Sequence, residues 1–131
     1  CSSDLTVTRD IKKLGYQISL DDFGSGYSSL SYLSRLLFDE VKLDKSFIDQ
    51  LTTDVKIVKA VEIIAALKDV YGFSVVAEGV ETQEQYDILK KIGHFIIQGY
   101  YFSKPMPIHE CVDYCKNFNP GNYFFNVTNI Q

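Results

Sequence analysis

The chain has 131 residues, of which 46% are hydrophobic, so it is long enough for one ordinary domain and does not have the composition of a disordered, collagen-like or coiled-coil protein. No apolar stretch approaches the roughly 18 residues of a membrane helix, and the first residues do not resemble a signal peptide. We therefore expect a cytoplasmic protein, whose longer parent chain could be membrane-anchored upstream. The net charge of −4 argues against nonspecific binding to duplex nucleic acid, which needs a basic surface.

The first half of the chain alternates helical and strand-like segments. A helix is predicted over residues 5–14, and Gly15 ends it at the position where glycine is most often found. A short strand follows over residues 17–21. After a glycine-rich turn, residues 28–36 are predicted to form a short helix, and residues 40–44 form a strand in which apolar and polar side chains alternate.

The second half begins with the best predicted helix, residues 55–71, whose apolar side chains fall on one side. A strand is predicted over residues 74–78. Thr82 is a suitable N-cap for a helix that runs to about residue 92, because Gln85 follows it at the spacing of a capping box. Residues 95–98 form the fourth predicted strand.

A last helix is predicted to start near Pro107. It carries two of the three cysteines, Cys111 and Cys115, spaced four residues apart. An odd cysteine count does not suggest a disulfide framework, so we expect reduced thiols packed on or beside this helix. Reduced cysteines are typical of a cytoplasmic protein.

Helices that alternate with single short strands need crossover connections, so the sequence predicts an α/β fold with a parallel sheet and outer helices. Alternate side chains of a strand point to opposite faces of the sheet. The polar residues that this rule places on one face, near the carboxyl ends of the four strands, are Asp21, Lys42, Glu78 and Gln98. Functional residues of parallel α/β proteins collect at these ends, so we expect the four side chains to converge.

Asp21 and Asp22 are adjacent, and a glycine-rich segment follows them. Two neighbouring carboxylates repel each other unless a cation or a shared proton neutralises them, and glycines let the backbone curl around a ligand. The pair therefore suggests a metal site. Taken alone, it could also be a helix-capping or turn pair, and Lys42 could be a structural ion-pair partner of Asp21.

Four segments carry a resemblance to a known family. They are Asp-Asp-Phe-Gly-Ser-Gly-Tyr-Ser-Ser-Leu at 21–30, Lys-Leu-Asp-Lys-Ser-Phe-Ile at 42–48, Ala-Glu-Gly-Val-Glu-Thr at 77–82 and Gln-Gly-Tyr-Tyr-Phe-Ser-Lys-Pro at 98–105. With these motifs the chain resembles the EAL family of cyclic di-GMP phosphodiesterases. The resemblance implies a (β/α)8 barrel that uses Mg2+ or Mn2+ to hydrolyse one phosphodiester bond of cyclic di-GMP, giving linear pGpG.

The resemblance also implies roles for the residues at the strand ends. Asp21 would bridge two metal ions, and Asp22 would bind the second. Lys42 would lie beside the attacking water and the scissile phosphate, and Glu78 would be the catalytic glutamate, which binds metal or activates water. Oxygen ligands suit Mg2+ and Mn2+, and two such ions can generate hydroxide and stabilise the departing oxygen.

Further residues would support the substrate or the loops of the site. By the same resemblance, Glu81 would hold the loop after the first strand in its metal-binding shape, and Gln98 would complete the rim of the site. The residues of that loop that would take part are Gly24, Ser25, Gly26 and Tyr27.

The chain departs from the family pattern in one respect. It contains no Glu-Ala-Leu motif, and the family's Asn and second Glu ligands are absent too. A complete barrel has eight strands and about 250 residues, so we expect residues 1–116 to be the C-terminal half of an EAL domain and residues 117–131 to be a tail. With three oxygen ligands missing, this chain alone is expected to be inactive, and its metal sites could be unoccupied.

An open half barrel would leave strand edges unpaired and apolar surface exposed, so we expect self-association. Cyclase or sensor modules could precede this segment on a longer chain. The alternative function is that of a non-catalytic EAL-like protein, which senses cyclic di-GMP or contacts another protein without hydrolysing the nucleotide.

Overall fold

The computed structural model describes residues 2–23 and 38–119. The predicted helix over residues 28–36 lies outside this part of the chain. So do four residues predicted to support the site, namely Gly24, Ser25, Gly26 and Tyr27.

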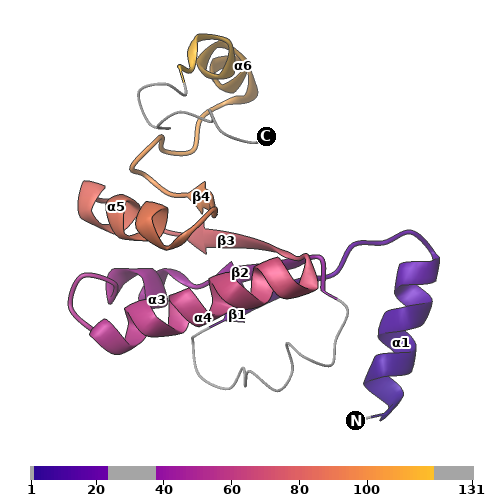
Figure 1. Ribbon diagram of the computed structural model, residues 1–131. Coiled ribbons are helices and arrows are strands. Elements are labelled where there is room, and N and C mark those ends of the chain that lie inside the picture. Colours follow the sequence, from indigo (N-terminus) through magenta and orange to yellow (C-terminus); the bar gives the residue numbers. More distant parts are fainter. Residues whose placement is uncertain (1, 24–37, 120–131) are drawn as a thin grey trace, which may run out of the picture.

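Helices and strands alternate along the described chain (Figure 1). In order, the elements are α1 (Ser2–Lys13), β1 (Ser19–Phe23), β2 (Glu40–Leu43), α3 (Lys45–Asp49), α4 (Val55–Tyr71), β3 (Ser74–Glu78), α5 (Gln83–Ile92), β4 (Ile96–Gln98) and α6 (Ile108–Asn117). The strands form one parallel sheet in the order β1-β2-β3-β4. The predicted α/β architecture with four parallel strands is therefore confirmed.

The ends of the two helices next to the site follow from local sequence. Asp54 caps α4 by accepting a hydrogen bond from the Lys56 N–H at 2.8 Å, and Gly72 ends the helix in a left-handed conformation with φ 75°. Thr82 and Gln85 form the predicted capping box at the start of α5. These caps fix where the chain enters and leaves the sheet.

The second strand is shorter than predicted, because Asp44 does not belong to it. Its carboxylate accepts a hydrogen bond from the Ser46 N–H at 2.8 Å, which makes Asp44 the N-cap of the short helix α3. The sequence reading missed α3, whose five residues are too few to show a helical period.

The first strand is shifted relative to the prediction of residues 17–21, since β1 begins at Ser19 and continues through the acidic pair to Phe23. Phe23 is buried in the core and lies in register with Leu43. Burial of this aromatic side chain accounts for the extension of the strand beyond the polar pair.

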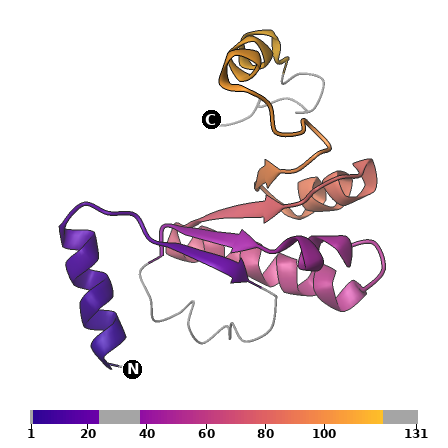
Figure 2. The same cartoon turned by 180° about the vertical axis from the view of Figure 1, so that it is seen from behind.

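One face of the sheet forms the hydrophobic core. Figure 2 shows the strands in front of α4, with no helix drawn in front of them. The strand residues that point into the core are Val41 and Leu43 of β2 and Val75 and Ala77 of β3. They are buried together with Val61 and Ile64 of α4 and Leu89 of α5. The opposite face of the sheet carries Lys42 and Glu78, so the polar side chains at the strand ends lie on the face that α4 does not cover.

No helix in the described residues has both the length and the apolar character that crossing a membrane requires.

Candidate functional site

Lys42 lies at the centre of a charged cluster that joins three strands. Its ammonium group forms an ion pair with the carboxylate of Glu78 on β3, and its Nζ lies 3.7 Å from Oδ1 of Asp21 on β1. The side chains of Lys42 and Glu78 are 28% and 19% exposed, whereas that of Asp21 is 63% exposed. The structure thus brings together three of the four residues that were expected to converge.

The electrostatics of this cluster keep Lys42 charged. The hydrogen bond to Glu78 is the largest cause that raises the pKa of the Lys42 ammonium above its ordinary value, and Asp21 adds to the effect. Lys42 therefore carries a full positive charge at neutral pH and can neutralise two carboxylates that would otherwise be unpaired.

Gln98, the fourth predicted residue, ends β4 directly beside the cluster. It lies in register with Glu78 on the neighbouring strand and is exposed. Its position at the carboxyl end of β4 is the one predicted, although no contact between its side chain and Lys42 is seen.

The acidic pair occupies a β-bulge. Leu20 is in register with Val41 and Phe23 with Leu43, so two residues of β1, Asp21 and Asp22, lie opposite the single residue of β2 between these pairs, which is Lys42. Asp22 has a φ of 54°, in the left-handed region that few residues other than glycine adopt. A regular strand would have turned the two carboxylates to opposite faces, whereas the bulge interrupts that alternation.

The loop between β3 and α5, residues 79–82, leads away from Glu78. Gly79 has a φ of 73°, which turns the chain sharply after the strand. The carboxylate of Glu81 lies 3.2 Å from Nζ of Lys45, the first residue of α3. The loop that Glu81 was expected to hold follows β1 and lies outside the described residues, so that role stays a prediction.

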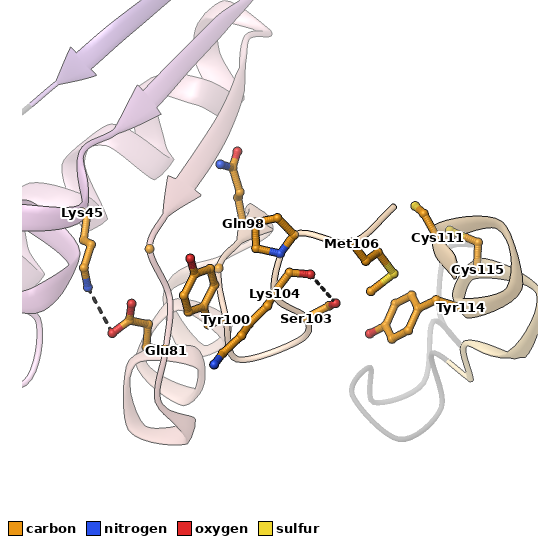
Figure 3. A pocket seen from close by; sticks show the side chains of 13 residues that line it. Lys45, Glu81, Gln98, Tyr100, Ser103, Lys104, Met106, Cys111, Tyr114 and Cys115 are labelled. Atoms are coloured by element: carbon orange, nitrogen blue, oxygen red, sulfur yellow. Dashed lines mark hydrogen bonds and ion pairs between the residues drawn. The ribbon is translucent and has the colours of Figure 1, made fainter. Parts of the chain in front are cut away.

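A cavity of about 660 Å³ opens beside this loop (Figure 3). It lies between the ends of β3 and β4 and helix α6. Glu81 and Gln98 line one side, and Tyr114, Cys111 and Cys115 of α6 line the other. The cavity begins one residue beyond Glu78, at Gly79, so the charged cluster and the cavity share the same edge of the sheet.

The two cysteines of α6 are both free thiols. A hydrogen bond with Cys115 raises the pKa of the Cys111 thiol, so Cys111 is protonated at neutral pH. They form part of the cavity wall.

The donor chemistry of the cluster suits a hard cation. Carboxylate oxygens are the ligands that Mg2+ and Mn2+ prefer, and Asp21, Asp22 and Glu78 supply them from two strands. In the described residues, however, no group of three Asp, Glu, His or Cys side chains is close enough to hold a metal ion. The Lys42 ammonium lies instead between Asp21 and Glu78, where it supplies the positive charge that the carboxylates need.

A parallel sheet with charged and amide side chains gathered at the carboxyl ends of its strands is typical of enzymes built on (β/α) barrels. The EAL domain family model matches residues 2–105, and the chain belongs to this family. The predicted family resemblance is therefore confirmed.

Relatives and solved structures agree with this assignment. The chain is 45% identical over 100 residues to the oxygen sensor protein DosP of Escherichia coli and 39% identical over 105 residues to the cyclic di-GMP phosphodiesterase RocR of Pseudomonas aeruginosa. The PaMucR phosphodiesterase in complex with c-di-GMP superposes with a TM-score of 0.72 at 39% identity. Klebsiella pneumoniae BlrP1, in a manganese and cy-diGMP complex, superposes with a TM-score of 0.70 at 34% identity.

These matches cover most of this chain but less than half of each matched protein. The matched regions are 76% of the chain and 12% of DosP, and 80% of the chain and 27% of RocR. The PaMucR match covers 84% of this chain and 44% of the PaMucR chain, and the BlrP1 match covers 76% of this chain and 25% of the BlrP1 chain. The chain thus corresponds to part of an EAL domain within larger proteins.

Sequence reasoning missed one residue of the site, Lys45. It belongs to the motif at 42–48, but its partner Glu81 lies in a different motif, 36 positions further along the chain. The signal that could have found it is a lysine at the start of a helix. The helix dipole stabilises a cation only near the C-terminal end of a helix, so a lysine at the N-terminal end favours a nearby carboxylate as its partner.

Proposed function

We propose that the chain is the C-terminal half of a phosphodiesterase domain that hydrolyses cyclic di-GMP to linear pGpG. The observation that carries the proposal is the cluster of Asp21, Lys42 and Glu78 on one face of three adjacent strands, in a chain of the EAL family. RocR is named as a cyclic di-GMP phosphodiesterase, and PaMucR binds c-di-GMP. Cyclic di-GMP is therefore the substrate that we infer for the complete domain.

In the complete domain, Asp21, Asp22 and Glu78 would hold two divalent ions, Mg2+ or Mn2+. The manganese in the BlrP1 complex supports the use of such ions. When bound, they would supply a hydroxide nucleophile and stabilise the departing oxygen.

The chain's own residues would act on the phosphate directly. Lys42 is protonated at neutral pH, so its ammonium can neutralise charge on the phosphate oxygens. Glu78 would orient the attacking water or a metal ion, and Gln98 would close the rim of the site. Glu81 and residues 24–27 would support the loops around it.

The 131-residue chain alone is expected to be inactive, because it contains no Glu-Ala-Leu motif and lacks the family's Asn and second Glu ligands. We expect a longer chain with the preceding half of the barrel to release pGpG from cyclic di-GMP in the presence of Mg2+ or Mn2+. Chromatographic separation of the nucleotides measures this for both chains.

The result separates the two functions considered. Metal-dependent hydrolysis by the 131-residue chain would contradict the proposed need for the missing ligands. Tight binding of cyclic di-GMP by the longer chain without hydrolysis would instead support a sensor or scaffold.

We also propose that the 131-residue chain self-associates. Strands β1 and β4 form the two edges of the described sheet, and Ile96 on β4 leaves 52% of its surface exposed. Light scattering should detect dimers or larger species, and Ile96→Lys should shift them toward monomer, because a charge on an edge strand opposes pairing. A monodisperse monomer of the unaltered chain would contradict this proposal.

Additional modules are proposed to precede this segment in a longer chain. DosP is named as an oxygen sensor, and Pseudomonas aeruginosa MucR is named as a bifunctional diguanylate cyclase and cyclic di-GMP phosphodiesterase. An EAL domain in such proteins is one part of a larger chain, in which a sensor or cyclase could control hydrolysis. We propose a cytoplasmic location, which fits the free thiols of Cys111 and Cys115.

A further inference from the structure

The backbone that follows Glu78 is held from two sides. The loop of residues 79–82 contacts α3 on one side, through Lys45, and the segment after β4 on the other. We propose that Lys45 is a positioning residue, which fixes the loop and thereby the placement of Glu78. The expected effect on hydrolysis rests on the proposed function, whereas the effect on the loop does not.

The aliphatic stem of Lys45 packs against Gly79. A Cβ atom on Gly79 would lie between 2.5 and 2.8 Å from the Cβ, Cγ and Cδ atoms of Lys45. The lysine stem thus occupies the space that a side chain at position 79 would need. Because Gly79 directly follows Glu78, the stem limits how far the end of β3 can move toward α3.

The ammonium group of Lys45 joins the loop to α3. Its Nζ lies 3.2 Å from Oε2 of Glu81 and 3.1 Å from Oδ1 of Asp49. The hydrogen bond to Asp49, followed by that to Glu81, raises the pKa of Lys45, so the group is charged at neutral pH. One cation therefore connects a carboxylate of the loop with a carboxylate of the helix, as Figure 3 shows for Glu81.

Helix α3 is a firm support for this contact. Phe47 and Ile48 are buried in the hydrophobic core, and Asp44 caps the start of the helix. A lysine attached to such a helix can restrain a neighbouring loop, because the helix itself cannot shift without disturbing the core.

The other side of the loop is held by backbone hydrogen bonds. The Val80 N–H donates to the carbonyl of Gln98 at 3.2 Å, and the Tyr101 N–H donates to the carbonyl of Val80 at 3.0 Å. Gln85 accepts a hydrogen bond from the Glu81 N–H at 2.9 Å. These contacts do not involve Lys45, so its removal should loosen the loop without unfolding the chain.

Three substitutions separate the two parts of the lysine. Lys45→Met keeps the stem against Gly79 and removes the charge. Lys45→Ala removes the charge and the stem beyond Cβ, and Lys45→Arg keeps the charge. Lys59→Met is the matched control, because Lys59 forms an exposed ion pair with Glu62 at 2.7 Å on α4, away from the loop.

Amide hydrogen exchange in the 131-residue chain tests the restraint itself. Exchange at Val80 and Glu81 should accelerate about twofold to fivefold in Lys45→Met, which is the range for one partly exposed ion pair. It should accelerate further in Lys45→Ala and return toward the original rate in Lys45→Arg. Unchanged exchange at both amides in Lys45→Ala would overturn the proposal.

Kinetics of the longer chain test the consequence for Glu78. We expect Lys45→Met to lower kcat severalfold and to leave KM within about twofold, because a misplaced catalytic group affects the transition state more than substrate binding. Combining it with Glu81→Gln should cost no more than either change alone. Equal kcat for Lys45→Met and Lys59→Met would overturn the link to Glu78, whereas absence of hydrolysis in the unaltered longer chain would overturn the proposed function and leave the exchange result to decide the restraint.

Discussion

Replacing Gly99 by alanine is expected to destabilise the chain by about 2–4 kcal/mol. A Cβ atom at this position would overlap the N and O atoms of Val80 and would lie 2.7 Å from its carbonyl carbon. These are backbone atoms, so no side-chain rotation can relieve the overlap. The backbone must separate, which breaks the hydrogen bonds that Val80 makes with Gln98 and Tyr101.

Urea unfolding of the 131-residue chain measures this effect. The matched control is Gly93→Ala, since a Cβ there would meet only Ala65 at 3.8 Å and Phe95 at 4.0 Å, and the φ of Gly93 is 168°, which is extended backbone. We expect the control to change the free energy of unfolding by less than about 0.5 kcal/mol. Equal stability of the two variants would show that the loop and β4 do not pack as closely as described.

Replacing Glu78 by glutamine is expected to lower kcat of the longer chain by about 10²- to 10⁴-fold while the fold is retained. Glutamine has the same shape, but it can neither bind a divalent ion strongly nor accept a proton. Glu78 lies on the face of the sheet that α4 leaves uncovered, so the change creates no cavity in the core. Glu62→Gln is the control, because Glu62 forms an exposed ion pair on α4.

The same substitution has a readout in Lys42 that does not depend on activity. Glu78 is the main cause of the raised Lys42 pKa, so Glu78→Gln should bring this pKa down toward 10.5, and Asp21→Asn should do so to a smaller extent. In the unaltered chain the ion pair stabilises the fold below the unfolded lysine pKa, and this contribution is lost as the pH rises through the raised value. NMR titration of Lys42 measures the change. Retained hydrolysis in Glu78→Gln would contradict the catalytic assignment.

Much of the fold could be predicted because its signals are local. The helix at Val55–Tyr71 has the predicted bounds, since its apolar period and the glycine after it lie within one segment. The alternation of side chains along β2 and β3 was enough to place Lys42 and Glu78 on one face.

The features that the sequence did not reveal depend on contacts between segments. The bulge at Asp21 and Asp22 is defined by the register of β1 against β2, which one strand alone does not encode. The pairing of Lys45 with Glu81 joins helix α3 to the loop after β3, and only the parallel order of the strands brings these two segments together. Asp44 was read as the last strand residue because the alternation continues through it, but its capping hydrogen bond starts α3 instead.

The separation of the two faces of the sheet has a consequence for how such domains can change in evolution. The side chains of the main hydrophobic core lie on the face that the helices cover, whereas Lys42, Glu78 and Asp21 lie on the other. A descendant that lost Glu78 would keep its core, its helix caps and the cavity beside the loop. Selection for folding alone would therefore not remove such a descendant. If the proposed function holds, loss of hydrolysis would then need no compensating change in the core, and inactive members are an expected product of this architecture.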